Sequence, residues 1–354
     1  MPSLMGSADT PGMTFDDVIN FVQAHFTDGL VMVVGSGLSA AEGMPGMPAL
    51  ADHLKTSATE LQGEDVTAWS NIVSMLDAKK GLEAALIKHA PSDSLETWIR
   101  KKTCDLLLPK ERELIQAVVK GERTLRLTSL LSKILKPAEG LPILTPNYDR
   151  LIEVACQMAN FHVDTTAIGD YAGAFDYKRS SMASCRGIVS RAKATVLDHF
   201  PRAIILKPHG SLDWYRNGDN AIRCSVDLDA ERLIITPGLN KYKVGYDFPF
   251  DMHRELANKY INRAARLLIV GYGFNDDHLQ THLMKRIRDG TPTLILTRSA
   301  TQTAQLLAQT SPNCVSLTRS KVWPGVAVVT NGAQFEQQGR DLWDLAVLAK
   351  EVLS

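Results

Sequence analysis

Three short polar segments hold the side chains of this chain that could perform chemistry. Residues 146–149 carry an amide and a carboxylate, residues 208–211 carry an imidazole, and residues 271–278 carry two aspartates. Each segment directly follows a short apolar run that is typical of a buried strand. Ligands of open parallel sheets bind where the carboxyl ends of the strands meet. We therefore expect Asn147, Asp149 and His209 at one site, where they could orient a polar substrate and accept a proton.

Each of these residues also has a purely structural interpretation. Asn147 and Asp149 could cap the helix that follows them, and Asp276 and Asp277 could do the same at a later helix. His209 could be a buried histidine whose ring nitrogens are satisfied by backbone groups. We favour a shared site because the polar clusters all fall directly after predicted strands.

A glycine-rich segment precedes them in the chain. Residues 30–34, LVMVV, form an unbroken apolar run, and residues 35–40, GSGLSA, then fit the pattern G-x-G-x-x-G/A. Glycine lets the backbone approach a pyrophosphate closely, and the helix that follows directs its N–H groups at the phosphates. A tight turn without any ligand uses glycine for the same steric reason. The acidic residue expected about 20 positions later is not clear, because Asp52 falls in a stretch that is predicted to be helical.

The remaining elements must hold these segments in place. Strand-like runs occur at residues 30–34, 141–145, 203–207, 233–236, 267–271, 293–297 and 326–330. Helical patterns occur at residues 14–27, 49–61, 68–78, 81–89, 94–103, 110–121, 125–135 and 338–354. Short apolar strands separated by helices indicate a parallel sheet that is covered on both faces. The sequence thus predicts a Rossmann-like α/β fold with a helical insertion at residues 49–136.

Two other regions carry weaker patterns. Residues 160–202 are predicted to contain two helical pieces and a polar loop at 171–184, and residues 213–231 a hairpin or loop that turns at Asn217 and Gly218. We treat residues 1–354 as one domain with a loose start at residues 1–12.

Composition excludes several classes of protein. The 354 residues are 45% hydrophobic and 22% charged, with 39 basic and 39 acidic side chains, so no basic excess points to nucleic-acid binding. No apolar run is long enough to span a bilayer, and residues 1–18 lack the pattern of a secretory signal. The five cysteines form no C-x-x-C pair, which predicts reduced thiols in a cytoplasmic protein and no paired-cysteine zinc site.

The glycine segment and the three polar segments together resemble the sirtuin-like (silent information regulator) domain. The matching segments are residues 35–40 with 43–45, residues 145–149 (TPNYD), residues 207–211 (KPHGS) with Trp214, and residues 271–278 (GYGFNDDH). They stand in the family's order, and the chain is most similar to bacterial sirtuin-like NAD hydrolases of anti-phage defence. Unlike the deacetylase sirtuins it has no C-x-x-C pairs, and residues 46–48 (GMP) replace their Pro-Asp-Phe-Arg continuation.

The resemblance implies a function and a set of site residues. It implies an NAD+ hydrolase that releases nicotinamide and ADP-ribose, with Asn147 orienting the ribose and the water, His209 as base, and Asp149 accepting from the carboxamide. It further implies that NAD, the substrate and sole cofactor, is held by Gly35, Ser36, Gly37, Ser39, Ala40, Gly43, Pro45, Thr145, Tyr148, Gly210, Gly271, Tyr272, Gly273 and Phe274. No metal is implied.

Partners and alternatives also follow from the resemblance. Related defence enzymes assemble, so we expect a homo-oligomer or a separate partner such as a HerA-type ATPase, and neither a membrane nor a nucleic-acid partner. One alternative is a subunit that binds NAD or ADP-ribose without catalysis. Another is a zinc-free deacylase or ADP-ribosyltransferase. His278 and His282 have the i, i+4 spacing of metal ligands, but no further ligand is positioned beside them.

Overall fold

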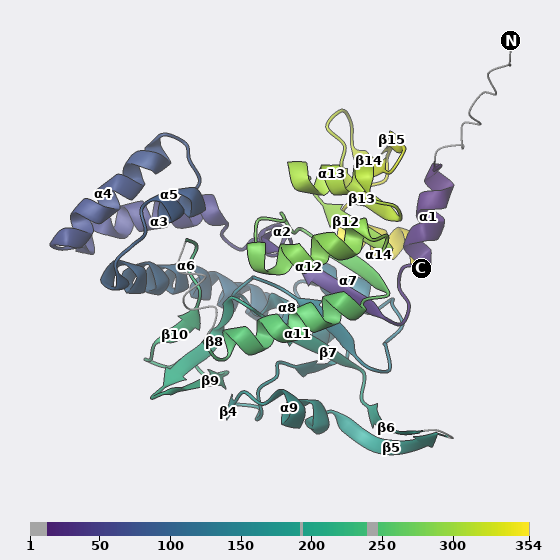
Figure 1. Ribbon diagram of the computed structural model, residues 1–354, viewed down its shortest axis with the longest axis horizontal. Helices are drawn as coiled ribbons and strands as arrows, with labels where there is room; N and C mark the ends of the chain where they lie inside the picture. The colour runs from purple at the N-terminus through teal and green to yellow at the C-terminus, as the bar shows by residue number, and fades with distance from the viewer. Residues whose placement is uncertain (1–12, 192–193, 239–246, 354) are drawn as a thin grey trace, which may run out of the picture.

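The computed structural model describes residues 13–191, 194–238 and 247–353, so the predicted loose start at residues 1–12 lies outside the described residues. Its centre is a nine-stranded sheet in the order β15-β14-β13-β12-β11-β1-β2-β7-β3 (Figure 1). The strands are β1 Leu30–Val34, β2 Leu141–Leu144, β3 His162–Asp164, β7 Arg202–Leu206, β11 Arg266–Val270, β12 Thr293–Thr297, β13 Cys314–Arg319, β14 Gly325–Thr330 and β15 Ala333–Gln338. The strands from β13 to β3 are parallel, and β14 and β15 are antiparallel additions at one edge.

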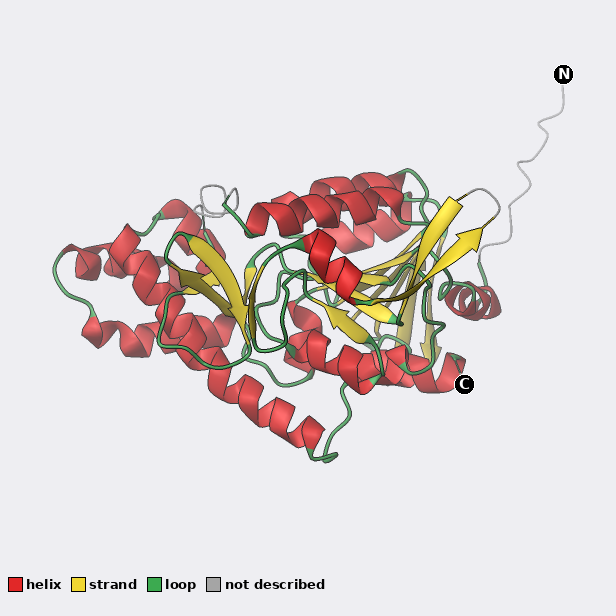
Figure 2. Ribbon diagram, turned by 90° about the horizontal axis from the view of Figure 1, so that it is seen from below, coloured by secondary structure: helices red, strands yellow, loops and turns green. Residues whose placement is uncertain are grey.

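Helices cover both faces of this sheet (Figure 2). One face packs against α1 Phe15–Gln23, α2 Ser36–Ala41, α7 Arg126–Leu131, α8 Leu151–Met158 and α14 Leu345–Val352. The other face packs against α11 Phe250–Arg263, α12 Asp277–Arg288 and α13 Gln302–Thr310. Alternate residues of β1 enter opposite cores, with Met32 in the first and Val33 in the second. This two-sided burial explains why β1 is apolar throughout, and the predicted α/β fold is confirmed.

The strand order places a topological switch point between β1 and β11. The chain leaves β1 toward β2 and β7 on one side, and it later returns to β11 and β12 on the other side. The helices that follow β1 and β11, α2 and α12, therefore pack on opposite faces of the sheet. A crevice at the carboxyl ends of the strands forms at such a point.

The helical insertion forms its own cluster beside the sheet, at the left of Figure 1. It comprises α3 Met47–Ser57, the short 3₁₀ helix η1 Ala58–Glu60, α4 Glu64–Asp77, α5 Leu82–Lys88 and α6 Asp93–Val119. Leu54, Ile72, Leu86 and Ile99 are fully buried in the core that these helices share. Two predicted helices merge into α6, which continues through Pro109, so the predicted break at residues 104–109 is wrong.

Antiparallel strands correct three sequence predictions. One small sheet contains β10 Arg232–Ile234, β8 Gly210–Asn217, β9 Asn220–Cys224 and β4 Ala172–Ala174, and another pairs β5 Cys185–Arg191 with β6 Ala194–His199. The run at 233–236 thus belongs to an antiparallel sheet. The region 160–202 is mainly strands, with one short helix, α9 Tyr177–Ala183. The last helix begins at Leu345 because residues 333–338 form β15, whereas the predicted hairpin turn at Asn217 is confirmed.

The helices of the described ranges include none with the length and apolar character of a bilayer-spanning segment.

Candidate active site

A cavity of about 260 Å³ opens at the carboxyl ends of β1, β2, β7 and β11, beside the helical insertion. Nine of the predicted residues line it: Ser36, Ser39, Pro45, Asn147, Tyr148, Asp149, His209, Tyr272 and Gly273. They come from four loops that are far apart in the sequence, and each loop directly follows one of these strands. The structure therefore brings all three predicted catalytic side chains to one cavity at the switch point of the sheet.

Asn147 joins the loop after β2 to the loop after β1. Its side-chain Nδ2 donates to the Gly35 carbonyl oxygen over 3.0 Å and to Ser39 Oγ over 2.9 Å. Its own backbone N–H donates to Thr145 Oγ1 over 3.1 Å. Both amide hydrogens are thus used within the protein, so the Oδ1 carbonyl oxygen is the polar atom that Asn147 can offer to a ligand.

Asp149 lies beside Asn147 and is 5% exposed. One carboxylate oxygen accepts the Leu151 N–H over 3.2 Å at the start of α8, and the carboxylate also bonds to the Ser39 hydroxyl. Burial raises the pKa of Asp149, and the nearby Lys207 cation opposes that shift in part. The N-cap residue of α8 is Arg150, so Asp149 is not the cap that its structural interpretation requires, although it bonds to the first N–H of the helix and lines the cavity.

His209 enters the cavity from the turn after β7 and is 6% exposed. Its Nε2 atom lies 2.9 Å from Oδ2 of Asp276, which follows the β11 loop and lines the same cavity. The two atoms are close enough for an ion pair with a protonated imidazole, although they are not aligned as a hydrogen bond. The backbone carbonyl of His209 accepts the Ile235 N–H, which holds the turn against the strand region of β10.

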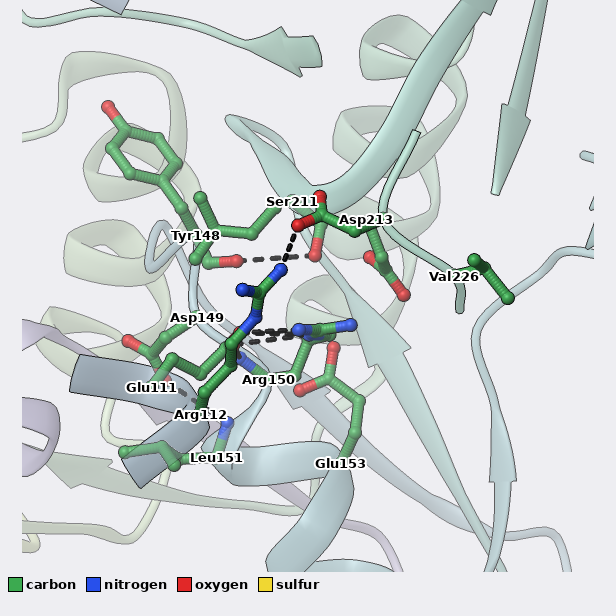
Figure 3. A network of polar contacts seen from close by, with 12 residues as sticks. Glu111, Arg112, Tyr148, Asp149, Arg150, Leu151, Glu153, Ser211, Asp213 and Val226 are labelled. Carbon is green, nitrogen blue, oxygen red and sulfur yellow. Dashed lines mark hydrogen bonds and ion pairs between the residues drawn. The ribbon is translucent and has the colours of Figure 1, made fainter. Parts of the chain in front are cut away.

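A buried lysine joins the turns that carry Asn147 and His209. Lys207 Nζ donates to the Asp149 carbonyl oxygen over 2.5 Å, to Glu153 Oε1 over 2.9 Å and to Ser211 Oγ over 3.1 Å. Figure 3 shows the surrounding network, in which Ser211 donates to the Tyr148 carbonyl oxygen. Lys207 is 2% exposed and so ties the 146–149 turn to the 208–211 turn inside the protein.

Arg150 anchors the other end of the same turn. Its guanidinium and its backbone N–H both donate to Glu111 of α6, which is fully buried (Figure 3). A larger cavity of about 830 Å³ lies on this side of the turn and is lined by Arg112, Arg150 and Glu153 among others. It contains none of the predicted site residues, so we place the candidate active site in the smaller cavity.

The two glycine turns pack directly against each other. The N–H groups of Gly35 and Gly37 donate to the carbonyl oxygens of Val270 and Gly271, each over 2.9 Å. A Cβ atom on Gly35 would lie 2.5 Å from the Tyr272 Cα, and one on Gly271 would lie 2.6 Å from the Leu38 nitrogen. These glycines are therefore required for contact between the turns, which is the structural explanation left open by the sequence.

Eight predicted residues do not line the cavity. They are Gly35, Gly37, Ala40, Gly43, Thr145, Gly210, Gly271 and Phe274. Thr145 supports Asn147, and Gly210, with a φ of +85°, leaves space beside Leu233 and Phe250. Phe274 is buried in the core beneath α12, 5.2 Å from the Tyr272 ring. Thr145, Gly210 and Phe274 thus contact or make room for neighbouring residues and do not line the cavity themselves.

Sequence reasoning missed part of the cavity wall. Asp276 is not among the predicted site residues, although it stands within the matched segment at residues 271–278 and lines the cavity. Glu83 of α5 and Thr103 and Leu107 of α6 also line the cavity. No local pattern marks these three, because only the packing of the insertion against the sheet brings them to the site.

Metal ligation finds no support in the described residues, where no three His, Cys, Asp or Glu side chains gather in a suitable group. His282 lies 3.2 Å from the Asn262 side-chain oxygen, and the side chain of His278 lies outside the described part. The five cysteines carry free thiols.

Comparisons with known proteins give one family match. Residues 142–313, which include the loops after β2, β7 and β11, match the family model of the SIR2-like domain. Curated protein sequences gave no match.

Solved structures give distant matches. A Sir2 homologue in complex with NAD is 13% identical with a TM-score of 0.39, over 96% of this chain and 95% of that chain. A Sir2 complex with a deacetylated p53 peptide and 3′-O-acetyl ADP-ribose is 10% identical with a TM-score of 0.42, over 96% and 98% of the two chains. At these TM-scores we infer nothing about function from either structure.

Proposed function

We propose that this protein is an NAD+ glycohydrolase that cleaves the bond between nicotinamide and ribose. One observation carries the proposal: Asn147, Asp149 and His209 line the same cavity beside the glycine turns, within or next to a stretch that matches the SIR2-like domain. The products are nicotinamide and ADP-ribose.

The reaction needs little acid catalysis. The nicotinamide of NAD+ is a cationic pyridinium, so when the C1′–N bond breaks its electron pair neutralises the ring, and nicotinamide leaves uncharged. The ribose is left with oxocarbenium character, and a water oxygen then bonds to C1′. The water loses one proton, so NAD+ and water give nicotinamide, ADP-ribose and a proton.

Asn147 is suited to place the ribose and the water. Because both of its amide hydrogens are donated to Gly35 and Ser39, its orientation is fixed before any substrate binds. The Oδ1 oxygen can then accept from a ribose hydroxyl or from the attacking water. A group that is already positioned contributes to the rate by holding reactants in a productive geometry.

His209 and Asp276 form the proton-accepting pair of this proposal. The imidazole takes the proton from water or from a ribose hydroxyl, and the carboxylate 2.9 Å from Nε2 stabilises the imidazolium that forms. Asp149 serves the leaving group, because its buried carboxyl group lines the cavity and can bond to the nicotinamide carboxamide.

We extend the proposal to the cellular role that the sequence resemblance implies. On that basis the protein is a cytoplasmic effector that depletes NAD during phage infection, as a homo-oligomer or with a HerA-type ATPase. Family analogy alone supports this step.

The test measures nicotinamide release from NAD+ by the purified chain, alone and with the products of neighbouring genes. We expect Asn147→Ala and His209→Ala to slow release by about 10²–10⁴-fold. His282→Ala, a histidine that does not line the cavity, is the matched control and should leave release unchanged. Release that survives both cavity substitutions would remove the proposed site, and release only with an acyl peptide or other acceptor would indicate a transferase.

A further inference from the structure

A third cavity, of about 620 Å³, lies at the carboxyl ends of β12 and β13 and is lined by positively charged side chains. Arg298 follows β12, Arg319 ends β13, and Lys321 stands two residues later. The residues that line this cavity include no aspartate or glutamate. We call this cavity the β12–β13 pocket.

The three cations of the β12–β13 pocket have no ion-pair partner among the described residues. These cations are Arg298, Arg319 and Lys321. Glu336 accepts from the Ser320 hydroxyl over 2.7 Å and is not one of the residues that line the pocket. Arginines elsewhere on the surface are commonly paired, as Arg186 is with Asp198. An uncompensated cluster of this kind favours an anionic ligand, and guanidinium groups bind phosphate particularly well.

One hydrogen bond links the wall of the candidate active site to the segment beside the β12–β13 pocket. Both lie at the carboxyl ends of parallel strands and hence on one edge of the sheet. Gly273 lines the active-site cavity, and its carbonyl oxygen accepts the Thr301 hydroxyl over 3.0 Å. Ala300, the residue before Thr301, lines the β12–β13 pocket. The two cavities are therefore neighbours across the β11 glycine turn.

The active-site cavity is too small to hold a whole dinucleotide, so the substrate of the proposed reaction extends beyond it. The active-site cavity of about 260 Å³ is smaller than the roughly 300–1,000 Å³ of common ligand pockets. With nicotinamide at Asn147 and His209, the adenosine half of a dinucleotide extends beyond the cavity, and the carboxyl ends of β12 and β13 are the next along the same edge of the sheet. There Trp323, 41% exposed, offers a ring face on which a base could stack.

We propose that the β12–β13 pocket binds an adenosine that carries a 2′-phosphate, so that NADP+ is a better substrate than NAD+. This inference rests on the proposed function. An uncharged ribose hydroxyl has no negative charge for three unpaired cations to balance. A 2′-phosphate adds close to two negative charges. An arginine beside the adenosine ribose is also how dinucleotide-binding folds accommodate a 2′-phosphate.

The test separates binding from catalysis. Calorimetry compares adenosine 2′,5′-bisphosphate with adenosine 5′-diphosphate, two probes of similar charge that contain no nicotinamide. We expect the 2′,5′-isomer to bind the native protein about tenfold more tightly or better. The double variant R298Q/R319Q should lose this preference, and Lys133→Gln, an exposed lysine after α7, should keep it. Nicotinamide release from NADP+ and from NAD+ is then measured with the same three proteins.

Each outcome decides a different point. Equal affinity for the two probes, or a preference that persists in R298Q/R319Q, overturns the 2′-phosphate inference even if NAD+ is cleaved. A preference that only the double variant loses supports it. If neither dinucleotide is cleaved while that pattern of binding holds, the hydrolase proposal fails and the 2′-phosphate pocket stands.

Discussion

Replacing Gly35 by alanine should break the contact between the two glycine turns. The added Cβ would lie 2.5 Å from the Tyr272 Cα and closer still to the Gly271 carbonyl oxygen, and both are backbone atoms that cannot rotate away. The loops after β1 and β11 must therefore separate. Backbone strain at residue 35 does not contribute to this effect, because any residue can adopt the Gly35 φ of −98°.

The magnitude follows from what the separation disrupts. Overpacking costs about 1–3 kcal/mol. The two hydrogen bonds from Gly35 N and Gly37 N contribute about 1 kcal/mol each. Gly35→Ala should therefore lower the free energy of unfolding by about 3–5 kcal/mol. It should also reduce NAD+ cleavage, because Asn147 is oriented by the Gly35 carbonyl oxygen.

The assay is urea unfolding followed by circular dichroism, with Gly187→Ala as the matched control. A Cβ on Gly187, in β5, would meet nothing within 4 Å. That control should be as stable as the native protein or slightly more stable, since glycine within a strand is unfavourable. If Gly35→Ala unfolds within about 0.5 kcal/mol of Gly187→Ala, a difference typical of surface substitutions, the packing of the glycine turns is refuted.

Three further predictions concern groups around the site. Lys207→Met should lower the unfolding free energy by about 3–5 kcal/mol, because it leaves the Glu153 carboxylate buried without its cation, and the double variant with Glu153→Gln should recover part of the loss in urea unfolding. Burial lowers the pKa of His253 to about 3, so stability from its neutral form is complete above pH 6.5 and falls as the pH drops toward 3. The free energy of unfolding should therefore be about 2 kcal/mol lower at pH 5 than at pH 7.5. In His253→Asn this difference should disappear from urea unfolding measured at the two pH values. Tyr148→Phe should cost about 1 kcal/mol and leave the KM for NAD+ unchanged, because the hydroxyl donates to the Ile235 carbonyl oxygen.

Contrary results are equally specific. Native-like stability of Lys207→Met would mean that the buried ion pair is absent. An unchanged pH dependence in His253→Asn would assign the acid sensitivity to other groups, among them His25, whose pKa burial lowers to about 4. A raised KM for NAD+ in Tyr148→Phe would mean that the Tyr148 hydroxyl contacts the substrate, as the sequence resemblance implies.

The sequence predicts the site better than it predicts the elements around it. Asn147 and His209 follow short apolar strands, and parallel strands bring their carboxyl ends to one edge, so local pattern and general topology suffice to place them together. The burial of β1 on both faces was likewise visible in its uninterrupted apolar run.

Other features depend on tertiary contacts that no local pattern encodes. Residues 94–103 and 110–121 are predicted as two helices, yet α6 is continuous through Pro109, and both of its halves are buried, at Ile99 and at Leu114. Residues 185–199 form an exposed hairpin, whereas the sequence predicts helical pieces and a polar loop in this region. Asp276 stands in a polar segment that follows a predicted strand, but its position 2.9 Å from His209 depends on the tertiary structure.

The central claim is that Asn147 and His209 act on the same N-glycosidic bond, and a double-mutant cycle on NAD+ cleavage tests it most directly. Rates are measured for the native protein, Asn147→Ala, His209→Ala and the double variant. Groups that act together are strongly non-additive, so the double variant should be about as slow as the slower single variant. Losses that multiply, or a double variant that cleaves NAD+ at the native rate, would contradict the account.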